Sequence, residues 1–209
     1  MAEGKAVRPL KAGLTGSIGM GKTETGKMFA RLGVTVHDSD AAVHALYDRG
    51  GLAVAPIAKA FPEAVREGKV DREALARAVT GDDAAFERLE AIVHPLVCKV
   101  QRDFLKVASS RGEDLVVLDI PLLFETSAEE DMDAVIVVSA PEEVQRERVL
   151  ARPGMSLEKL GAIVTRQVPD AQKRAKADFV VETGKGLDHA FEQVKRIVET
   201  LRRRAREQG

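Results

Sequence analysis

The chain has 209 residues, of which 44% are hydrophobic and 31% are charged, and its formal net charge is −1. This length and composition predict a globular protein with a sizeable core, either one large domain or one domain with an inserted subdomain. A charge so close to neutrality excludes the strong positive field that holds nucleic acid or an anionic membrane, so neither is expected as a partner.

Neither a secretion signal nor a disulfide framework is expected. The segment MAEGKAVRPLK at 1–11 lacks the apolar core of a signal peptide, and no apolar run approaches the ~18 residues that cross a bilayer. The single cysteine, Cys98, excludes an internal disulfide and lies in the apolar context HPLVCKV, typical of a small buried side chain. We expect a cytoplasmic protein that is a monomer or a weak homo-oligomer.

Apolar segments alternate with helical patterns along the chain. Continuous runs of Val and Leu, such as LVVL at 115–118, are typical of strands buried on both faces of a parallel sheet. In chain order, strands are expected at 10–16, 33–38, 114–120, 133–140 and 177–182. Helices are expected at 22–32, 40–49, 71–79, 83–111, 141–151 and 186–207. The alternation predicts an α/β fold, a three-layer parallel sheet with right-handed crossovers.

Two helical insertions are expected beside this core. About 75 residues separate the second and third strands, which is too many for one crossover. We therefore expect a helical insertion at 50–111 and a second one at 152–176. The core then consists of 1–49, 112–151 and 177–209. Within the first insertion, His94-Pro95 is expected to interrupt the long helix.

A glycine-rich segment, GSIGMGKT at 16–23, matches the pattern Gly, four residues of any type, Gly-Lys-Ser/Thr, between an expected strand and an expected helix. In such a loop successive backbone N–H groups form an anion site, which we expect side chains at Gly16, Gly19 and Gly21 to obstruct. The helix N-terminus adds partial positive charge and unpaired donors. The alternative is a glycine-rich turn with a capping threonine.

This loop predicts the binding of a nucleoside triphosphate with Mg²⁺. Lys22 is expected to reach the β and γ phosphates, and the Thr23 hydroxyl is expected to contact Mg²⁺. The residues themselves leave open whether the nucleotide is ATP or GTP. The expected phosphate contacts come from Gly16, Ser17, Ile18, Gly19, Met20, Gly21, Lys22 and Thr23.

Three classes of protein use such a loop: switches, ATP-driven machines and small-molecule kinases. A GTPase needs a base-reading Asn-Lys-x-Asp motif, which this sequence lacks, and the chain is short for a motor. A small kinase needs an acid near the acceptor hydroxyl, a pocket for the acceptor and mobile cations over the phosphates. The remaining candidate residues are therefore interpreted as parts of a kinase.

Three aspartates are candidates for the acidic groups. Asp38 ends the second expected strand, where ligands bind in open parallel sheets, and is expected to orient an acceptor hydroxyl and take up its proton. Asp40 is a candidate ligand of a metal-bound water or of the substrate. The alternative for both is that they cap a helix. Asp119 ends another strand and either holds Mg²⁺ through water or caps the segment turned by Pro121.

Two arginines are candidates for the cations. Arg148 and Arg152 have i, i+4 spacing and share a helix face, from which they are expected to fold over the phosphates and neutralise the charge that develops in transfer. Gly154 breaks the helix, so 152–176 is interpreted as a lid that excludes water. The alternative for this segment is a solvated helix hairpin.

Three more residues are candidate substrate contacts. Leu122 lies in the apolar PLLFE segment, which is expected to form a pocket wall, and Glu125 closes that segment and is expected to face the site. His94 is either a core histidine with one hydrogen bond or a substrate contact.

With these residues assembled, the chain resembles the dephospho-coenzyme A kinases over nearly its whole length. The matching segments are GLTGSIGMGKT at 13–23, VHDSDAAVHALY at 36–47, IVHPLV at 92–97, IPLLFE at 120–125 and RQVPDAQKRAKADFVVETG at 166–184. The resemblance implies a P-loop kinase core with a helical CoA-side domain and a lid. It also implies transfer of the γ-phosphate of ATP, with Mg²⁺, to the ribose 3′-hydroxyl of dephospho-CoA, the last step of CoA synthesis.

The resemblance also assigns roles and shows departures. It places the base on Asp38 and a lid arginine on Arg148 or Arg152. His44 stands where the family often has an arginine, so we expect a pH-dependent substrate contact there. Glu24 replaces a second hydroxyl residue after the P-loop lysine and adds negative charge to the helix N-terminus.

Two other functions remain as alternatives. One is a P-loop kinase of another small acceptor, such as a nucleoside or nucleoside monophosphate, although the large insertion suits a bulky acceptor. The other is a regulatory P-loop switch that hydrolyses nucleotide slowly and transfers phosphate to no small molecule.

Overall fold

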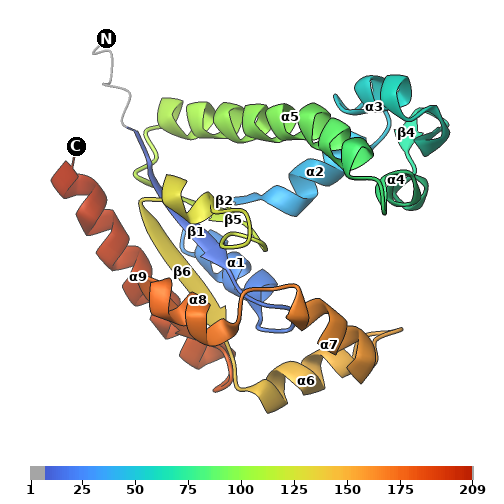
Figure 1. Cartoon of the computed structure of the whole chain (residues 1–209). Coiled ribbons are helices and arrows are strands. Elements are labelled where there is room, and N and C mark those ends of the chain that lie inside the picture. The colour runs from blue at the N-terminus through green and yellow to red at the C-terminus, as the bar shows by residue number, and fades with distance from the viewer. Residues whose placement is uncertain (1–7, 209) are drawn as a thin grey trace, which may run out of the picture. The chain divides into compact units, whose positions relative to one another are not determined.

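The structure, a computed structural model, describes residues 8–208 (Figure 1). The chain divides into two compact units. One is Asp38–Lys106, and the other is formed by the residues on either side of that range. Each unit has its own hydrophobic core.

The unit outside Asp38–Lys106 is built on a five-stranded sheet with the order β2-β5-β1-β6-β7. Its strands are β1 (Leu10–Thr15), β2 (Thr35–Asp38), β5 (Leu115–Asp119), β6 (Ala134–Ser139) and β7 (Phe179–Glu182). Strand β1 pairs in parallel with β5 and β6, and β6 pairs in parallel with β7. The register places Leu14 opposite Asp119 and Ser139 opposite Glu182. The predicted parallel sheet is confirmed.

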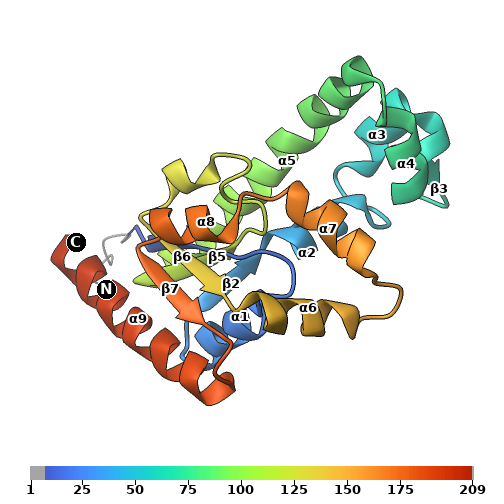
Figure 2. The same ribbon diagram turned by 60° about the horizontal axis from the view of Figure 1, so that its bottom comes forward.

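Alternate side chains of this sheet enter two different cores. Ile136 and Val138 pack with the helices α1 (Lys22–Arg31) and α9 (Leu187–Gln208). Val135 and Val137 face the other way, toward the segment after β5 that contains Leu123 and the 3₁₀ helix η2 (Ala128–Asp131). Helix α8 (Asp170–Lys176) contacts β6, and Figure 2 shows α8 and α9 on opposite sides of the sheet. Because both faces of the sheet are covered, strands β5 and β6 are mostly apolar and show no alternation.

Two further helices follow β6, namely α6 (Glu142–Leu150) and α7 (Leu157–Thr165). Helix α7 contacts α6. Gly154, between them, has φ 74°, a value that glycine adopts without strain.

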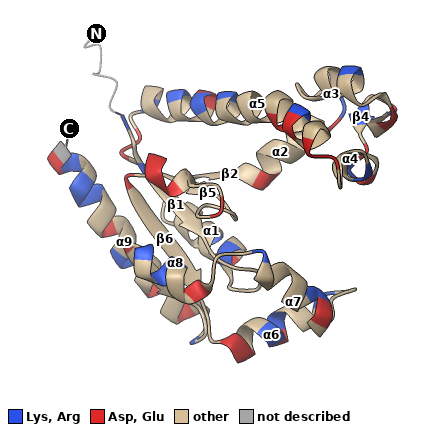
Figure 3. Cartoon of the chain, viewed as in Figure 1, with Lys and Arg blue, Asp and Glu red and all other residues tan. Residues whose placement is uncertain are grey.

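Helix α9 carries several arginines in its C-terminal half (Figure 3). Arg202 pairs with Asp114 at 3.5 Å between Nε and Oδ1, and an Arg204 nitrogen lies 4.0 Å from Asp178 Oδ1. These basic residues are therefore partly balanced by acids of their own unit.

The unit Asp38–Lys106 is mainly helical. It contains α2 (Ser39–Tyr47), α3 (Val54–Ala60), the 3₁₀ helix η1 (Pro62–Ala64), a hairpin of β3 (Val65–Arg66) and β4 (Lys69–Val70), α4 (Arg72–Val79) and most of α5 (Asp83–Ser110). Its core includes Leu46, Ile57, Phe61 and Leu75. No helix within residues 8–208 is long and apolar enough to cross a membrane.

The prediction that His94-Pro95 interrupts the long helix was wrong, because α5 continues through Pro95. Proline lacks an N–H, so the carbonyl of Ala91 loses its helical partner. Ala91 and Pro95 are both exposed, and water can therefore solvate that carbonyl. The cost of the proline is reduced at this position, and the helix runs on to Ser110.

Candidate nucleotide-binding site

The predicted phosphate-binding loop joins β1 to α1. Helix α1 begins at Lys22, and its N-cap residue, Gly21, has φ 97° and supplies no side-chain cap. The first amides of the helix are thus left for another acceptor, such as an anion. Glu24 in the first turn is paired with Lys27 at 2.7 Å, so its negative charge is partly offset.

The three glycines of the loop are required by what lies behind them. A Cβ at Gly16 would come 2.6 Å from the carbonyl oxygen of Val138, and one at Gly19 would come 2.5 Å from a side-chain methyl of α6. A Cβ at Gly21 would lie 3.2 Å from Thr183 Oγ1. The expectation that side chains there would obstruct the anion site stays a prediction, and these distances show a second constraint on the three positions. The glycines let the loop pack against β6, α6 and the segment after β7.

Two glutamines form hydrogen bonds with the backbone of Ile18, one with its carbonyl oxygen and one with its N–H. The buried Gln145 of α6 donates from Nε2 to the Ile18 carbonyl oxygen at 2.7 Å. The Ile18 N–H donates to Oε1 of Gln167, which follows α7, at 3.2 Å. Neither glutamine was predicted from the sequence. Gln167 lies in one of the segments that resemble the kinase family, and this was the only indication of its importance. Gln145 lies in none of these segments.

Arg148 supports the loop from α6. Its Nη1 donates to Thr183 Oγ1 at 2.9 Å and lies 3.5 Å from the Gly19 carbonyl oxygen, and its Nη2 donates to the Thr183 carbonyl oxygen at 2.8 Å. Thr183 Oγ1 in turn donates to the Met20 carbonyl oxygen at 2.7 Å. Arg148 thus bonds to protein backbone beside the predicted phosphate site. Arg152 lies just beyond α6 and is exposed.

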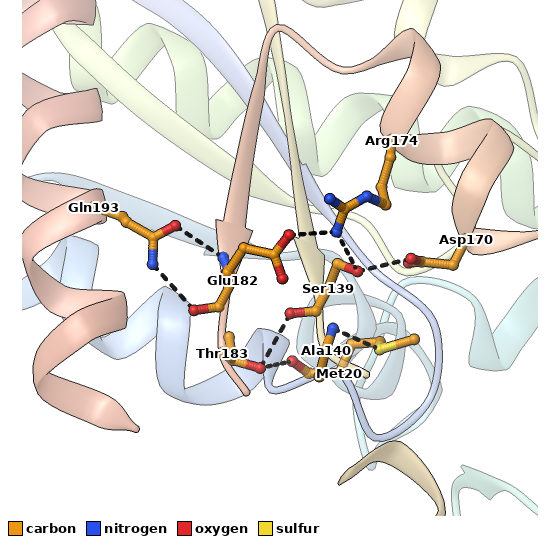
Figure 4. Close-up of polar contacts among 8 residues, drawn as sticks. All are labelled: Met20, Ser139, Ala140, Asp170, Arg174, Glu182, Thr183 and Gln193. Carbon is orange, nitrogen blue, oxygen red and sulfur yellow. Dashed lines mark hydrogen bonds and ion pairs between the residues drawn. The ribbon is translucent and has the colours of Figure 1, made fainter. Parts of the chain in front are cut away.

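A second polar cluster ties the ends of β6 and β7 to α8 (Figure 4). Ser139 Oγ donates to Asp170 Oδ2 at 2.7 Å and accepts from Arg174 Nη1 at 3.0 Å. Arg174 also pairs with Glu182 at 2.5 Å. Gln193 of α9 bonds to both backbone groups of Glu182 at 3.0 Å. The strand ends beside the loop are therefore fixed by helices on both faces.

Lys22 forms an ion pair with Asp119. The two side chains are only 18% and 10% exposed, and Asp119 is the last residue of β5. The ammonium expected to reach the phosphates therefore lies against the carboxylate expected to hold Mg²⁺ through water.

The oxygen atoms near the loop fit Mg²⁺ delivered with a nucleotide. Mg²⁺ prefers oxygen ligands and usually keeps water and substrate phosphates beside one or two carboxylates. Thr23 is the second residue of α1 and is exposed, and Asp119 supplies a carboxylate. Among residues 8–208, no group of three or more His, Cys, Asp or Glu side chains is gathered for a metal.

Glu125 is part of a buried ion pair. Its Oε1 lies 2.9 Å from the ammonium of Lys173, whose side chain is 0% exposed, and accepts from the Val168 N–H at 2.8 Å. Burial raises the pKa of the Glu125 carboxyl, but the hydrogen bonds from Lys173 and Val168 outweigh it and hold that pKa below its usual range. Glu125 joins the segment after β5 to α8, and its predicted substrate contact stays a prediction. Leu122, in the same segment, is exposed.

The other candidates lie in the unit Asp38–Lys106. Asp38 caps α2, because its Oδ1 accepts from the Ala41 N–H at 2.9 Å, and Asp40 is exposed in the first turn. The helix-capping alternative is thus observed for Asp38, and its catalytic role stays a prediction.

The two histidines of this unit are exposed. His44 Nε2 lies 2.7 Å from Arg72 Nη1. His94 is exposed on α5, with Nε2 3.6 Å from the sulfur of the half-buried Cys98, so the alternative of a core histidine was wrong. Their substrate contacts stay predictions.

Comparisons with known proteins identify one family. The family model described as dephospho-CoA kinase matches residues 10–189. A dephospho-CoA kinase of Mesorhizobium japonicum is 56% identical over 190 residues, which cover 91% of this chain and 95% of that protein. The crystal structure of a Thermus thermophilus protein is similar with a TM-score of 0.78 and 35% identity, covering 92% of this chain and 97% of that one. A dephospho-CoA kinase from Campylobacter jejuni, 22% identical over 93% of this chain and 98% of its own, shares the fold with a TM-score of 0.64.

Proposed function

The chain belongs to the dephospho-CoA kinase family, and from this premise we propose that it transfers the γ-phosphoryl group of ATP to the ribose 3′-hydroxyl of dephospho-CoA. The products are CoA and ADP, and the reaction is the last step of CoA synthesis. The observation that carries the proposal is the loop at 16–23, whose glycines pack against β6, α6 and Thr183 and whose lysine opens α1. The comparisons do not favour the alternative of another small acceptor.

The loop and its lysine bind the triphosphate in this proposal. Backbone N–H groups of 16–23 and the N-terminus of α1 hold phosphate oxygens, and Lys22 moves from Asp119 to the β and γ phosphates. Thr23, with Asp119 or Asp40 through water, would hold Mg²⁺, which would supply charge neutralisation at the phosphates.

Asp38 orients the acceptor hydroxyl and accepts its proton late in the transfer. A carboxylate is a weak base for an alcohol. It is sufficient in a loose phosphoryl-transfer transition state, where the hydroxyl loses its proton late. Such a role is worth about 10²–10⁴ in rate.

The remaining candidates receive more limited roles. We assign Arg148 to support of the loop, because its guanidinium bonds to Thr183, and Arg152 to neutralising the charge that develops in transfer. His44, His94 and Leu122 are proposed substrate contacts. Glu125 is also a proposed substrate contact, and its Oε1 lies 2.9 Å from the ammonium of Lys173.

A comparison of acceptors tests the proposal. ADP formation from ATP is measured with dephospho-CoA, adenosine or AMP as the acceptor, and the product is identified by its mass. We expect turnover with dephospho-CoA to exceed that with adenosine or AMP by orders of magnitude and to yield CoA. Equal turnover with AMP would support the other kinase, and ADP formation that no acceptor accelerates would contradict both. The cytoplasmic location and the monomeric or weakly associated state stay predictions.

A further inference from the structure

We propose that a basic pocket on the unit Asp38–Lys106 binds the diphosphate of the acceptor. This inference rests on the proposed function, because it names where one part of dephospho-CoA is held. The pocket has a volume of about 460 Å³. It lies among the C-terminal half of α2, strand β4 and the start of α4, and its lining includes His44, Tyr47, Asp48, Lys69, Val70 and Arg72.

Local backbone structure fixes the two cations of this pocket. The β3–β4 hairpin turns through Glu67 and Gly68, which have φ 49° and 76°, and so places Lys69 on β4. Asp71 then caps α4 by accepting from the amides of the second and third helical residues at 3.1 and 3.0 Å. Lys69 and Arg72 therefore stand on either side of the Asp71 cap.

Arg72 differs from the neighbouring arginines in its partner. Arg66 pairs with Asp71 at 3.7 Å, and Arg77 pairs with Glu73 at 3.9 Å. In the part of the chain that the structure describes, neither Arg72 nor Lys69 forms an ion pair. Arg72 instead contacts the rings of His44 and Tyr47 on α2. Its Nη1 lies 2.7 Å from a His44 nitrogen, and its guanidinium carbon lies 5.9 Å from the centre of the Tyr47 ring.

The charges around the pocket favour an anion. Asp48 is the one acid in its described lining, and its Oδ1 already accepts from the Arg49 N–H at 2.8 Å. The two cations Lys69 and Arg72, which have no carboxylate partner among residues 8–208, therefore give the pocket an excess of positive charge over the single carboxylate of Asp48. Arginine matches phosphate oxygens through two parallel N–H groups, and lysine adds a point charge. Dephospho-CoA carries a diphosphate between its adenosine and its pantetheine. This diphosphate is the group that Lys69 and Arg72 are suited to bind.

The test compares Arg72→Gln with a control variant, Arg77→Gln. Arg77 lies on the same helix, is exposed and is paired with Glu73. The Kd of dephospho-CoA and of ATP is measured by calorimetry, and kcat/KM is measured with dephospho-CoA and with adenosine, which has no diphosphate. We expect Arg72→Gln to weaken dephospho-CoA binding and kcat/KM about 10- to 100-fold. ATP affinity and kcat/KM with adenosine should stay at the wild-type level. Lys69→Gln should act in the same direction.

The outcomes separate this inference from the function on which it rests. If the wild type uses dephospho-CoA and Arg72→Gln uses it equally well, the pocket assignment is wrong and the proposed function stands. Equal losses with dephospho-CoA and adenosine would also overturn the assignment. If the wild type does not use dephospho-CoA at all, the proposed function fails and the pocket falls with it.

Discussion

Single glycines of the phosphate-binding loop are constrained in two ways that substitution can separate. Gly19 has φ 78° and would place a Cβ 2.5 Å from Val149 Cγ2. Gly33, after α1, has a similar φ of 71°, but no atom lies within 4 Å of where its Cβ would be. The pair therefore distinguishes the cost of the left-handed backbone from the cost of displacing the loop from α6.

We predict that Gly33→Ala lowers the free energy of unfolding by about 1–2 kcal/mol and leaves ATP binding unchanged. Gly19→Ala should lower the free energy of unfolding further and weaken ATP binding at least about tenfold, because the loop must move away from Val149. Urea unfolding and calorimetric titration with ATP measure the two effects. Equal ATP affinities in the two variants would refute the idea that packing behind the loop shapes the phosphate site.

The glutamine contacts give a second test at the residue scale. Gln145 is buried, so Gln145→Ala leaves the Ile18 carbonyl without this partner. The substitution should lower the free energy of unfolding by about 1–3 kcal/mol. Gln167 is only half-buried, so Gln167→Ala should cost less. Amide hydrogen exchange at Ile18 should accelerate in Gln167→Ala. Unchanged exchange at that amide would show that Gln167 does not hold the loop in solution.

At the scale of elements, the ion pair Glu125–Lys173 joins the segment after β5 to α8. Glu125→Gln leaves the buried Lys173 charge without its carboxylate and should destabilise the protein by about 3 kcal/mol at pH 7. Glu130→Gln, an exposed substitution of the same type nearby, should change stability little. Urea unfolding of both variants and the wild type measures the difference.

The pH dependence of this difference follows from the lowered pKa of Glu125. The stabilisation is complete above the unfolded-state pKa of about 4.3 and is lost as the pH falls through the lower folded-state value. The gap between wild type and Glu125→Gln should therefore be full at pH 7 and narrow toward pH 3. A gap that widens on acidification would contradict the assigned direction of the pKa shift.

Elements with strong hydrophobic patterns were predictable, and short ones were not. The five strands of the parallel sheet and helices such as α9 were found, because long apolar runs and 3.6-residue periods mark them clearly. The hairpin Val65–Val70 was missed, since two-residue strands contain no alternation to detect. Helix α5 was found, but its passage through Pro95 depends on solvent exposure, which the local sequence does not reveal.

Site residues divide in the same way. The loop at 16–23 was identified by its spacing, which is a local property. The partners of that loop come from far along the chain, such as Gln145, Gln167 and Thr183, and hydrogen bonds of this kind leave no local pattern. The bonds of the Arg148 guanidinium to Thr183 also leave no local pattern, and the phosphate contact of Arg148 stays a prediction.

At the scale of the whole molecule, the chain combines a phosphate-binding unit with a unit that carries the proposed base and the proposed acceptor pocket. The parallel sheet presents the loop after β1 and Asp119 at the end of β5. The helical unit presents Asp38 at the start of α2 and the cations Lys69 and Arg72. The affinity for ATP should therefore depend mainly on the unit outside Asp38–Lys106, and the affinity for dephospho-CoA mainly on the unit Asp38–Lys106.

Calorimetry with ATP, combined with steady-state kinetics of Asp38→Asn, tests whether Asp38 accepts the proton of the acceptor hydroxyl without contributing to ATP binding. Asparagine keeps an oxygen that can accept from the Ala41 amide, so α2 retains its cap while the proton acceptor is lost. We expect the Kd of ATP to change less than about twofold and kcat with dephospho-CoA to fall about 10²–10⁴-fold. A kcat near that of the wild type, with CoA still formed, would show that Asp38 is not the proton acceptor.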